Sequence, residues 1–179
     1  RTSLGNGCPV CAGKQIIPGE NDLASQFPQL AAQWHPDKNG ALRPENVSPN
    51  SNRKVWWLCP LGHAWKATVT SRSREGAGCP FCAGRKVWPG FNDLETVEPK
   101  VAAQWHPTLN GQLTPRMVTA GSRRKVWWQC PEGHVWKAVV YSRAGKRKCG
   151  CPVCAGRISE ARMKAYRHMV GEQQGKTER

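Results

Sequence analysis

An internal duplication dominates the sequence, because a pattern of Cys, His, Trp and Pro residues recurs after 71 positions. When residues 12–72 are aligned with residues 83–143, 35 of the 61 pairs are identical. The cysteines follow the same repeat, since Cys59 aligns with Cys130 and one Cys-x2-Cys motif aligns with the next. Self-similarity at a fixed spacing is typical of repeated structural units, so a single large core is not expected.

The repeat divides the chain into four segments. Complete units are predicted at residues 12–82 and 83–154, and each ends with a Cys-Pro-x-Cys motif. Residues 1–11 resemble the last part of such a unit and are interpreted as the C-terminal remnant of a truncated repeat. Residues 155–179 depart from the pattern, and they are predicted to form a basic amphipathic helix over 158–170 followed by a disordered tail.

Each unit is predicted to combine a short helical segment with a β-hairpin. In the first unit, Asp22 is a good helix cap, and Asn39-Gly40 is expected to end the helical segment. The β-branched and aromatic residues at 54–58 predict a strand, and the alternation of apolar and polar residues over 63–70 predicts the returning strand. A tight turn carrying one Cys and one His joins these two strands.

Four potential metal ligands recur in each unit as Cys-x3-His, a gap of 15 or 16 residues, and Cys-x2-Cys. Zn²⁺ prefers four ligands in a tetrahedron, and two close pairs on separate turns supply that geometry. Disulfides are less favoured, because the sequence shows no secretory signal and a His is interleaved with the thiols. Two zinc sites are predicted, one formed by Cys59, His63, Cys79 and Cys82, and the other by Cys130, His134, Cys151 and Cys154.

The predicted sites are structural rather than catalytic, because a zinc ion with four protein ligands has no open position for a substrate or water. Metal binding of this kind supplies on the order of 10 kcal/mol to a unit that is too small for a large core. The expected fold class is therefore a small metal-stabilised α+β protein. It consists of tandem zinc-ribbon or treble-clef-like units, each a β-hairpin with a short helical segment, and a C-terminal helix.

Three further cysteines and two repeated histidines lie outside these ligand sets. Cys8 and Cys11 form an incomplete half-site, a third partial zinc site that another segment or chain would have to complete. Cys149 is interpreted as a spare thiol beside the second site, with replacement of a ligand or oxidation as alternatives. His35 and His106, in the repeated Trp-His-Pro motif, are expected to cap carbonyl groups or to face solvent, because the four-ligand sets are already complete.

Eight of the nine Trp residues form pairs between the two units. Large aromatic side chains are the expected source of a compact core around each zinc ion, so most of them are predicted to be buried. Adjacent residues in a strand point to opposite faces, which leaves one Trp of each neighbouring pair available for the surface. Trp57 and Trp128 are the candidates for exposed contacts.

The chain carries 27 Lys and Arg residues against 12 Asp and Glu, which gives a formal net charge of +15. The second unit, with 12 basic and 4 acidic residues, is more basic than the first, with 8 and 5. This excess favours a polyanionic partner over a merely solvated surface, and nucleic acid is the leading hypothesis, with DNA ahead of RNA. The candidate contacts are the basic residues that recur on and beside the hairpins: Arg53, Lys54, Lys66 and Arg72, then Arg124, Lys125, Lys137 and Arg143.

The sequence thus favours a non-catalytic module that binds nucleic acid. The alternative is a protein-interaction scaffold in which exposed Trp residues and the tail helix hold a partner. A zinc-organised nuclease is disfavoured, because the hairpin histidines serve as ligands and no acidic cluster remains to hold a catalytic Mg²⁺. Apolar runs of only a few residues argue against a membrane protein, so an intracellular location in the cytoplasm, nucleoid or nucleus is expected.

Three motifs of the second unit are specific enough for comparison with a known family: Ala102-Ala103-Gln104-Trp105-His106-Pro107, Lys125-Val126-Trp127-Trp128-Gln129-Cys130-Pro131-Glu132-Gly133-His134 and Cys151-Pro152-Val153-Cys154. They resemble the probable zinc-ribbon family, whose tandem repeats were long catalogued as a domain of unknown function. The resemblance covers nearly the whole chain except about the last 20 residues, and it implies that the eight residues named above are zinc ligands. Some members of that family carry an endonuclease domain after the repeats. A fused or partner nuclease is therefore expected, whereas no nuclease activity is expected of the repeats themselves.

Overall fold

The computed structural model describes residues 15–146, 148–159, 161, 162 and 164. The segment interpreted as a truncated repeat, residues 1–11, and most of the helix predicted over 158–170 lie outside the described residues. Within the described part of the chain, no helix has the length and apolar character that crossing a membrane requires.

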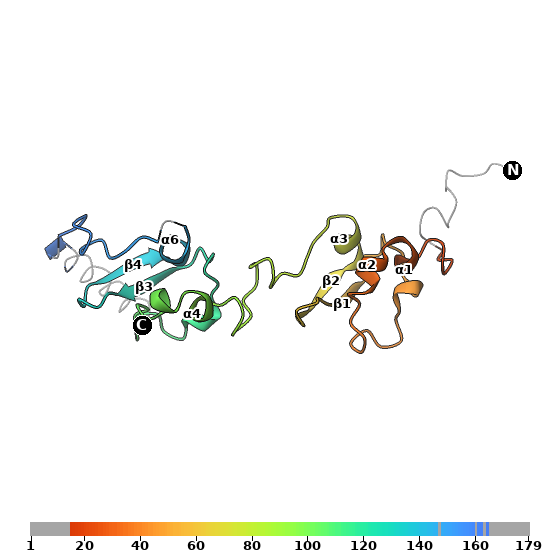
Figure 1. Cartoon of the computed structure of the whole chain (residues 1–179), viewed down its shortest axis with the longest axis horizontal. Helices are drawn as coiled ribbons and strands as arrows, with labels where there is room; N and C mark the ends of the chain where they lie inside the picture. The colour runs from red at the N-terminus through yellow and green to blue at the C-terminus, as the bar shows by residue number, and fades with distance from the viewer. Residues whose placement is uncertain (1–14, 147, 160, 163, 165–179) are drawn as a thin grey trace, which may run out of the picture. The chain divides into compact units, whose positions relative to one another are not determined.

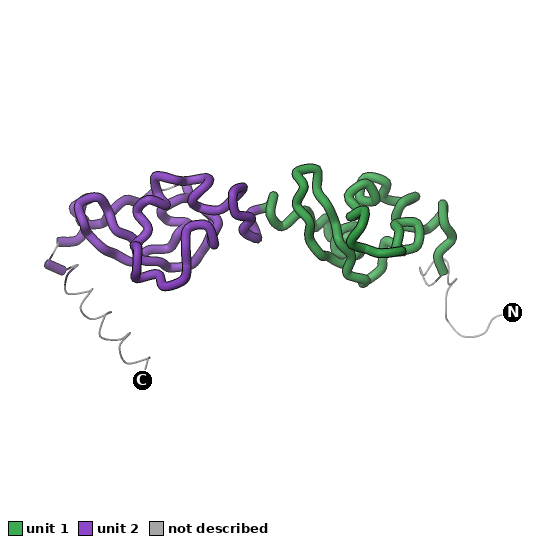
Figure 2. Tube along the Cα trace, turned by 90° about the horizontal axis from the view of Figure 1, so that it is seen from below, with its two compact units in different colours: residues 1–83 green, residues 84–179 purple. Residues whose placement is uncertain are grey.

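The chain divides into two compact units, unit 1 at Arg1–Ala83 and unit 2 at Gly84–Arg179 (Figure 2). Both have the same order of short elements (Figure 1). Unit 1 contains α1 (Leu23–Gln26), α2 (Pro28–Ala31), the 3-10 helix η1 (Pro44–Asn46), β1 (Lys54–Leu58), β2 (Ala64–Thr68) and α3 (Val69–Ser73). Unit 2 contains α4 (Leu94–Val97), α5 (Pro99–Ala102), η2 (Pro115–Met117), β3 (Lys125–Gln129), β4 (Val135–Val139) and α6 (Val140–Ala144). Each unit is a small, treble-clef-like α+β structure, as the sequence predicts.

An antiparallel hairpin is the centre of each unit. In unit 1, β1 pairs with β2 so that Trp57 lies opposite Trp65 and Trp56 lies opposite Lys66. The pairing of β3 with β4 in unit 2 has the same register, with Trp128 opposite Trp136. Alternation along the strands therefore gives each hairpin an inner face of Trp and Val and an outer face that carries Lys.

The outer edge of β1 is covered by the segment that follows α2. Leu58 N–H donates to the Gln33 carbonyl over 2.7 Å, and His35 N–H donates to the Trp56 carbonyl over 3.1 Å. Beyond them, the Asn39 amide accepts from Trp56 N–H over 2.7 Å and donates to the Trp56 carbonyl over 2.9 Å. The expectation that Asn39-Gly40 ends a helix is therefore wrong, because α2 ends at Ala31 and the Asn39 side chain pairs with a strand edge.

The returning strand is shorter than predicted. Instead of continuing to residue 70, β2 ends at Thr68 and α3 begins at Val69. Thr68 caps this helix, since its Oγ1 accepts from Ser71 N–H over 3.2 Å while Ser71 Oγ donates to the Thr68 carbonyl over 2.9 Å. Local side-chain hydrogen bonds of this kind compete with strand pairing and favour a turn into helix.

The first helix of each unit begins at a buried carboxylate. Asp22 accepts hydrogen bonds from the N–H groups of Gly19 and Ser25, and Asp93 does the same for Gly90 and Thr96. Burial opposes ionisation of both carboxyl groups, but these hydrogen bonds outweigh it and lower the pKa of each. The expectation that Asp22 caps a helix is confirmed, and the cap also fixes the turn at Gly19, where φ is 88°.

The core of each unit is built around a fully buried Trp. Trp57 and Trp128 are 0% exposed, and their indole N–H groups donate to the carbonyls of Ala67 and Ala138. Trp34 meets Trp57 edge-on, with ring centroids 5.5 Å apart. The expectation that Trp57 and Trp128 make exposed contacts is wrong, because these residues occupy the inner face of the hairpin.

Candidate metal centre

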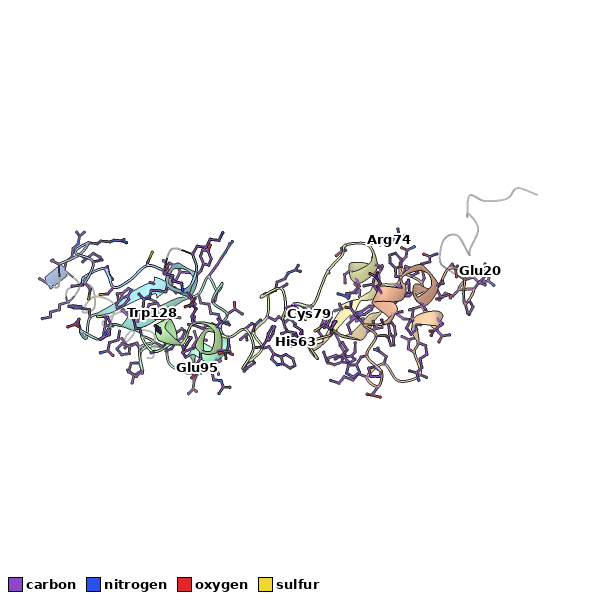
Figure 3. All side chains as sticks on the ribbon, in the orientation of Figure 1. Glu20, His63, Arg74, Cys79, Glu95 and Trp128 are labelled. Carbon is purple, nitrogen blue, oxygen red and sulfur yellow. The ribbon has the colours of Figure 1, made fainter. Side chains whose placement is uncertain are left out.

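The four predicted ligands of unit 1 converge at the turn of its hairpin, where Figure 3 labels His63 and Cys79. His63 Nδ1 lies 3.4 Å from the Sγ atoms of both Cys59 and Cys82, and 3.8 Å from Cys79 Sγ. The Sγ atoms of Cys59 and Cys82 are 3.8 Å apart. The structure thus brings together the Cys-x3-His and Cys-x2-Cys motifs.

The ligands of unit 2 have the same arrangement. His134 Nδ1 lies 3.4 Å from the Sγ atoms of Cys130 and Cys154, and these two sulfurs are 3.8 Å apart. Cys151 completes this group, in which all ligand atoms lie within 4.8 Å of one another. Two separate parts of the chain therefore reach the same four-ligand geometry.

These distances fit a tetrahedral zinc ion. With zinc bonds of about 2.3 Å to sulfur and about 2.0 Å to nitrogen, the corners of a tetrahedron lie about 3.8 Å apart for two sulfurs and about 3.5 Å apart for sulfur and nitrogen. The 3.8 Å between sulfurs and the 3.4 to 3.8 Å between sulfur and nitrogen match both edges. Each unit therefore holds one Cys₃His zinc site, and each His binds through Nδ1.

The hairpin turn positions the first two ligands. Cys59 N–H donates to the His63 carbonyl over 3.0 Å, and Gly62 N–H donates back to the Cys59 carbonyl over 2.9 Å. Gly62 has a φ of 81°, in the left-handed region that residues with a Cβ rarely adopt. The turn therefore closes tightly enough for a Cys and a His four residues apart to reach the same metal.

The electrostatics of the thiols favour a bound cation. Burial opposes ionisation of Cys59, but hydrogen bonds from the N–H groups of His63 and Leu61 outweigh it and lower the pKa of this thiol. Burial, together with the neighbouring thiols, raises the pKa of Cys82 to about 12. Three thiolates in one cluster repel one another, and a divalent cation removes this repulsion.

Both zinc sites are structural. Four protein ligands complete the tetrahedron, and no position remains for a water or a substrate. Three ligands of unit 1, Cys59, His63 and Cys79, are buried, while Cys82 is exposed. The corresponding exposed ligand of unit 2 is Cys154. One thiolate of each site can therefore be reached by a reagent in solution.

Among the described residues, Cys149, His35 and His106 do not join these clusters. Cys149 is half-buried, and its carbonyl accepts from Arg143. His35 is buried and His106 half-buried, and the Nδ1 atom of each accepts hydrogen bonds from the N–H groups two and three residues later. The histidines therefore cap amide groups rather than the expected carbonyls. Cys8 and Cys11 lie outside the described residues.

Six of the eight predicted nucleic-acid contacts are exposed. Lys66 and Lys137 lie on the outer faces of their hairpins, and their Nζ atoms are 5.2 and 5.4 Å from the ring centroids of Trp56 and Trp127. The others lie at the start of the first strand of each hairpin or directly before it: Lys54 and Lys125, then Arg53 and Arg124.

Arg72 and Arg143 are corrections to this set. Only 6% of Arg72 and 5% of Arg143 is exposed, so neither guanidinium can reach a phosphate from the surface. Arg72 donates to the Ala77 carbonyl over 2.7 Å and to Gln33 Oε1, and its guanidinium carbon lies 5.0 Å from the Trp57 ring centroid. Both arginines belong to the interior.

Two glutamines that were not predicted as functional residues hold these arginines. Gln33 accepts from Arg72, and Gln104 accepts from Arg143. A signal was present, because the two glutamines align in the repeat, as do the two arginines. A Gln and an Arg that both recur in the two units are compatible with a hydrogen bond between their side chains inside each unit.

A known protein family matches both units of the chain. The family described as a probable treble clef zinc finger domain matches residues 30–85 and 101–157. These two segments make up more than half of the chain, and each includes all four ligands of one zinc site. A search of curated proteins finds no match.

Proposed function

The chain belongs to the family of probable treble clef zinc finger domains, and we propose that its two zinc-stabilised units bind nucleic acid, with DNA preferred over RNA. The exposed basic side chains of the hairpins contact phosphate groups, while the zinc ions hold the hairpins in shape. The units are non-catalytic in this proposal, because each zinc ion has four protein ligands.

The observation that carries the proposal is the placement of exposed Lys residues at the same positions in both units. Lys66 lies over the Trp56 ring and Lys137 over the Trp127 ring, with Nζ atoms 5.2 and 5.4 Å from the ring centroids. An exposed lysine whose ammonium group is held over an aromatic ring by a cation–π interaction loses less freedom on binding a phosphate. Lys66 therefore supports a phosphate contact better than an unsupported surface lysine.

The charges of the hairpins are also not neutralised internally. Within the described residues, the ion pairs are Arg116 with Glu95 and Lys148 with Glu98, and neither involves a hairpin lysine. Unit 2 adds Arg123 beside Arg124 and Lys125, all three of them exposed. We therefore expect unit 2 to supply more of the affinity than unit 1.

Charge reversal on the hairpins tests this proposal. The variant K125E/K137E should bind a DNA duplex at least about tenfold more weakly, and the slope of log K against log salt should fall by about 2, since each phosphate contact contributes close to 0.9. K54E/K66E should have a smaller effect. Fluorescence anisotropy over a salt series measures both quantities.

The matched control is R85E/K86E, which changes the net charge equally at two exposed positions outside the hairpin. It should keep more of the affinity than K125E/K137E. Binding that does not depend on salt, or an equal loss in both variants, would contradict hairpin recognition. Cleavage of the duplex on addition of Mg²⁺ or Mn²⁺ would contradict the non-catalytic assignment.

A second candidate function is a protein-interaction scaffold. The observation that favours it is a set of exposed apolar side chains in unit 2, which includes Phe91, Val97, Met117 and Tyr141. The aligned residues of unit 1 are Glu20, Gln26, Asn46 and Thr70, all polar. A partner protein that copurifies in stoichiometric amount and is retained after nuclease treatment would favour this function over nucleic-acid binding.

A further inference from the structure

Each unit buries one arginine beside its metal centre, with the same contacts. Arg143 donates to the Cys149 carbonyl over 2.7 Å and to Gln104, and its guanidinium carbon lies 5.0 and 4.9 Å from the ring centroids of Trp128 and Trp136. Arg72 of unit 1 lies 5.0 and 5.1 Å from the rings of Trp57 and Trp65. The two guanidinium groups therefore occupy equivalent interior positions.

A buried guanidinium needs an anion nearby. Arginine keeps its proton in proteins, and an isolated charge in the interior is strongly unfavourable. Within the described residues, neither Arg72 nor Arg143 forms an ion pair with a carboxylate. The Nε atoms of both are buried and have no hydrogen-bond partner. Neutral carbonyl and amide oxygens satisfy the other nitrogens without balancing the charge.

The zinc ligands can balance this charge, because in unit 2 Arg143 lines one pocket together with Cys130, Cys151 and Cys154. In unit 1, the carbonyl that accepts from Arg72 belongs to Ala77, two residues before Cys79. Trp57, under the guanidinium, lies two residues before Cys59 and shares the inner face of the hairpin with it.

The charges of the thiols act on the buried arginines. Burial lowers the pKa of Arg72, while attraction to Cys79 and Cys59 acts in the opposite direction. In unit 2, burial lowers the pKa of Arg143, while attraction to Cys151, to Cys149, which is not a zinc ligand, and to Cys130 acts in the opposite direction.

We propose that Arg72 and Arg143 are the counter-ions of the two zinc centres. Zn²⁺ bound by three thiolates and one neutral imidazole carries a net charge of −1, and one guanidinium beside it makes the interior neutral. The arginine also withdraws electron density from the thiolates and makes them less nucleophilic. Its role is to protect the bound thiolates from electrophiles and oxidants. This role is separate from the proposed binding of nucleic acid.

The test measures thiolate reactivity in the full chain loaded with zinc. Iodoacetamide alkylates the thiolates, and a chromogenic chelator reports the zinc that is released. The variant R72M/R143M removes the charge while keeping an apolar side chain of comparable length. Its alkylation rate should rise roughly three- to tenfold, because thiolate reactivity follows the electron density on sulfur. R72K/R143K restores an amine at each position without the planar guanidinium, and its rate should lie between those of the parent chain and R72M/R143M.

Two further variants separate charge from structure. R43M/R116M removes two charges at exposed positions outside the hairpins, one in each unit, and should leave the rate unchanged. Q33E/Q104E keeps both arginines but gives each a carboxylate partner in place of its amide, and its rate should rise because the guanidinium charge is then shared. If R72M/R143M fails to retain two zinc ions, Q33E/Q104E still tests whether the guanidinium charge lowers the reactivity of the thiolates.

An unchanged rate in Q33E/Q104E would overturn the proposal, as would equal rates for the methionine and lysine variants with both zinc ions bound. An increase in R43M/R116M equal to that in R72M/R143M would also overturn it, because the effect would then follow net charge rather than the buried arginine.

Discussion

Replacing Cys59 by Ser should unfold unit 1 and leave unit 2 folded. The substitution removes a thiolate whose sulfur lies 3.4 Å from His63 Nδ1 and 3.8 Å from Cys82 Sγ. Structural zinc contributes on the order of 10 kcal/mol to a small domain, which is comparable with the whole stability of such a fold. The other unit has its own ligands and its own core, so its cooperative unfolding does not depend on Cys59.

Two-dimensional NMR of the full chain measures this result. The dispersed amide signals of β1 and β2 should collapse, while those of β3 and β4 persist. The matched control is Cys149→Ser, which removes a half-buried thiol beside the second site but outside its ligand set. This control should keep all dispersed signals. A folded hairpin in the Cys59→Ser variant, or loss of unit 2 in the Cys149→Ser variant, would contradict the ligand assignment.

Replacing Trp128 by Ala should destabilise unit 2 by about 3 to 5 kcal/mol, the usual range for removing a buried Trp. Trp128, labelled in Figure 3, is 0% exposed and meets Trp105 edge-on with ring centroids 5.3 Å apart. Its removal also takes away one of the two rings that stack on Arg143. A cavity and a poorly packed guanidinium therefore arise from one substitution.

Hydrogen–deuterium exchange of the zinc-loaded chain measures the loss of stability in each unit separately. Peptides that cover β3 and β4 should exchange faster in the Trp128→Ala variant, while peptides of β1 and β2 serve as an internal reference. Tyr141→Ala removes an aromatic ring that is 53% exposed in the same unit. It should cost less than about 1 kcal/mol. Equal effects of the two substitutions would contradict the assignment of Trp128 to the core.

The metal ligands could be predicted from the sequence because zinc chemistry restricts them strongly. One Cys-x3-His motif and one Cys-x2-Cys motif occur in each unit, which leaves few alternative ligand sets. The structure brings together the same eight residues that these motifs predict. The strands could be predicted for a similar reason, since one Val and two Trp residues occur together at the centre of both β1 and β3. The local chemistry of these residues is sufficient to specify both features.

The orientation of the Trp residues could have been inferred more fully. Alternation shows only that Trp56 and Trp57 face opposite ways. Cys59 must point at the metal, however, and residues two apart in a strand share a face. Trp57 therefore had to lie on the metal side, where the core forms. The position of the ligand Cys59 thus determines which Trp of the neighbouring pair faces the core.

Other features depend on contacts between distant parts of the chain. Arg72 meets Gln33 across 39 residues, and Asn39 pairs with Trp56 across 17. Neither partner is adjacent to the other in a strand or a helix, so periodicity carries no information about the contact. A basic residue beside a hairpin was therefore predicted to lie on the surface, although in Arg72 and Arg143 the charge is buried between Trp rings.

The central claim is that each unit is held by its own zinc ion. Native mass spectrometry of the purified chain tests it most directly, in a C8S/C11S variant that removes the half-site. We predict two zinc ions per chain, one after Cys59→Ser and still two after Cys149→Ser. A chain that carries no zinc and whose mass shows cysteines joined in disulfides would contradict the claim.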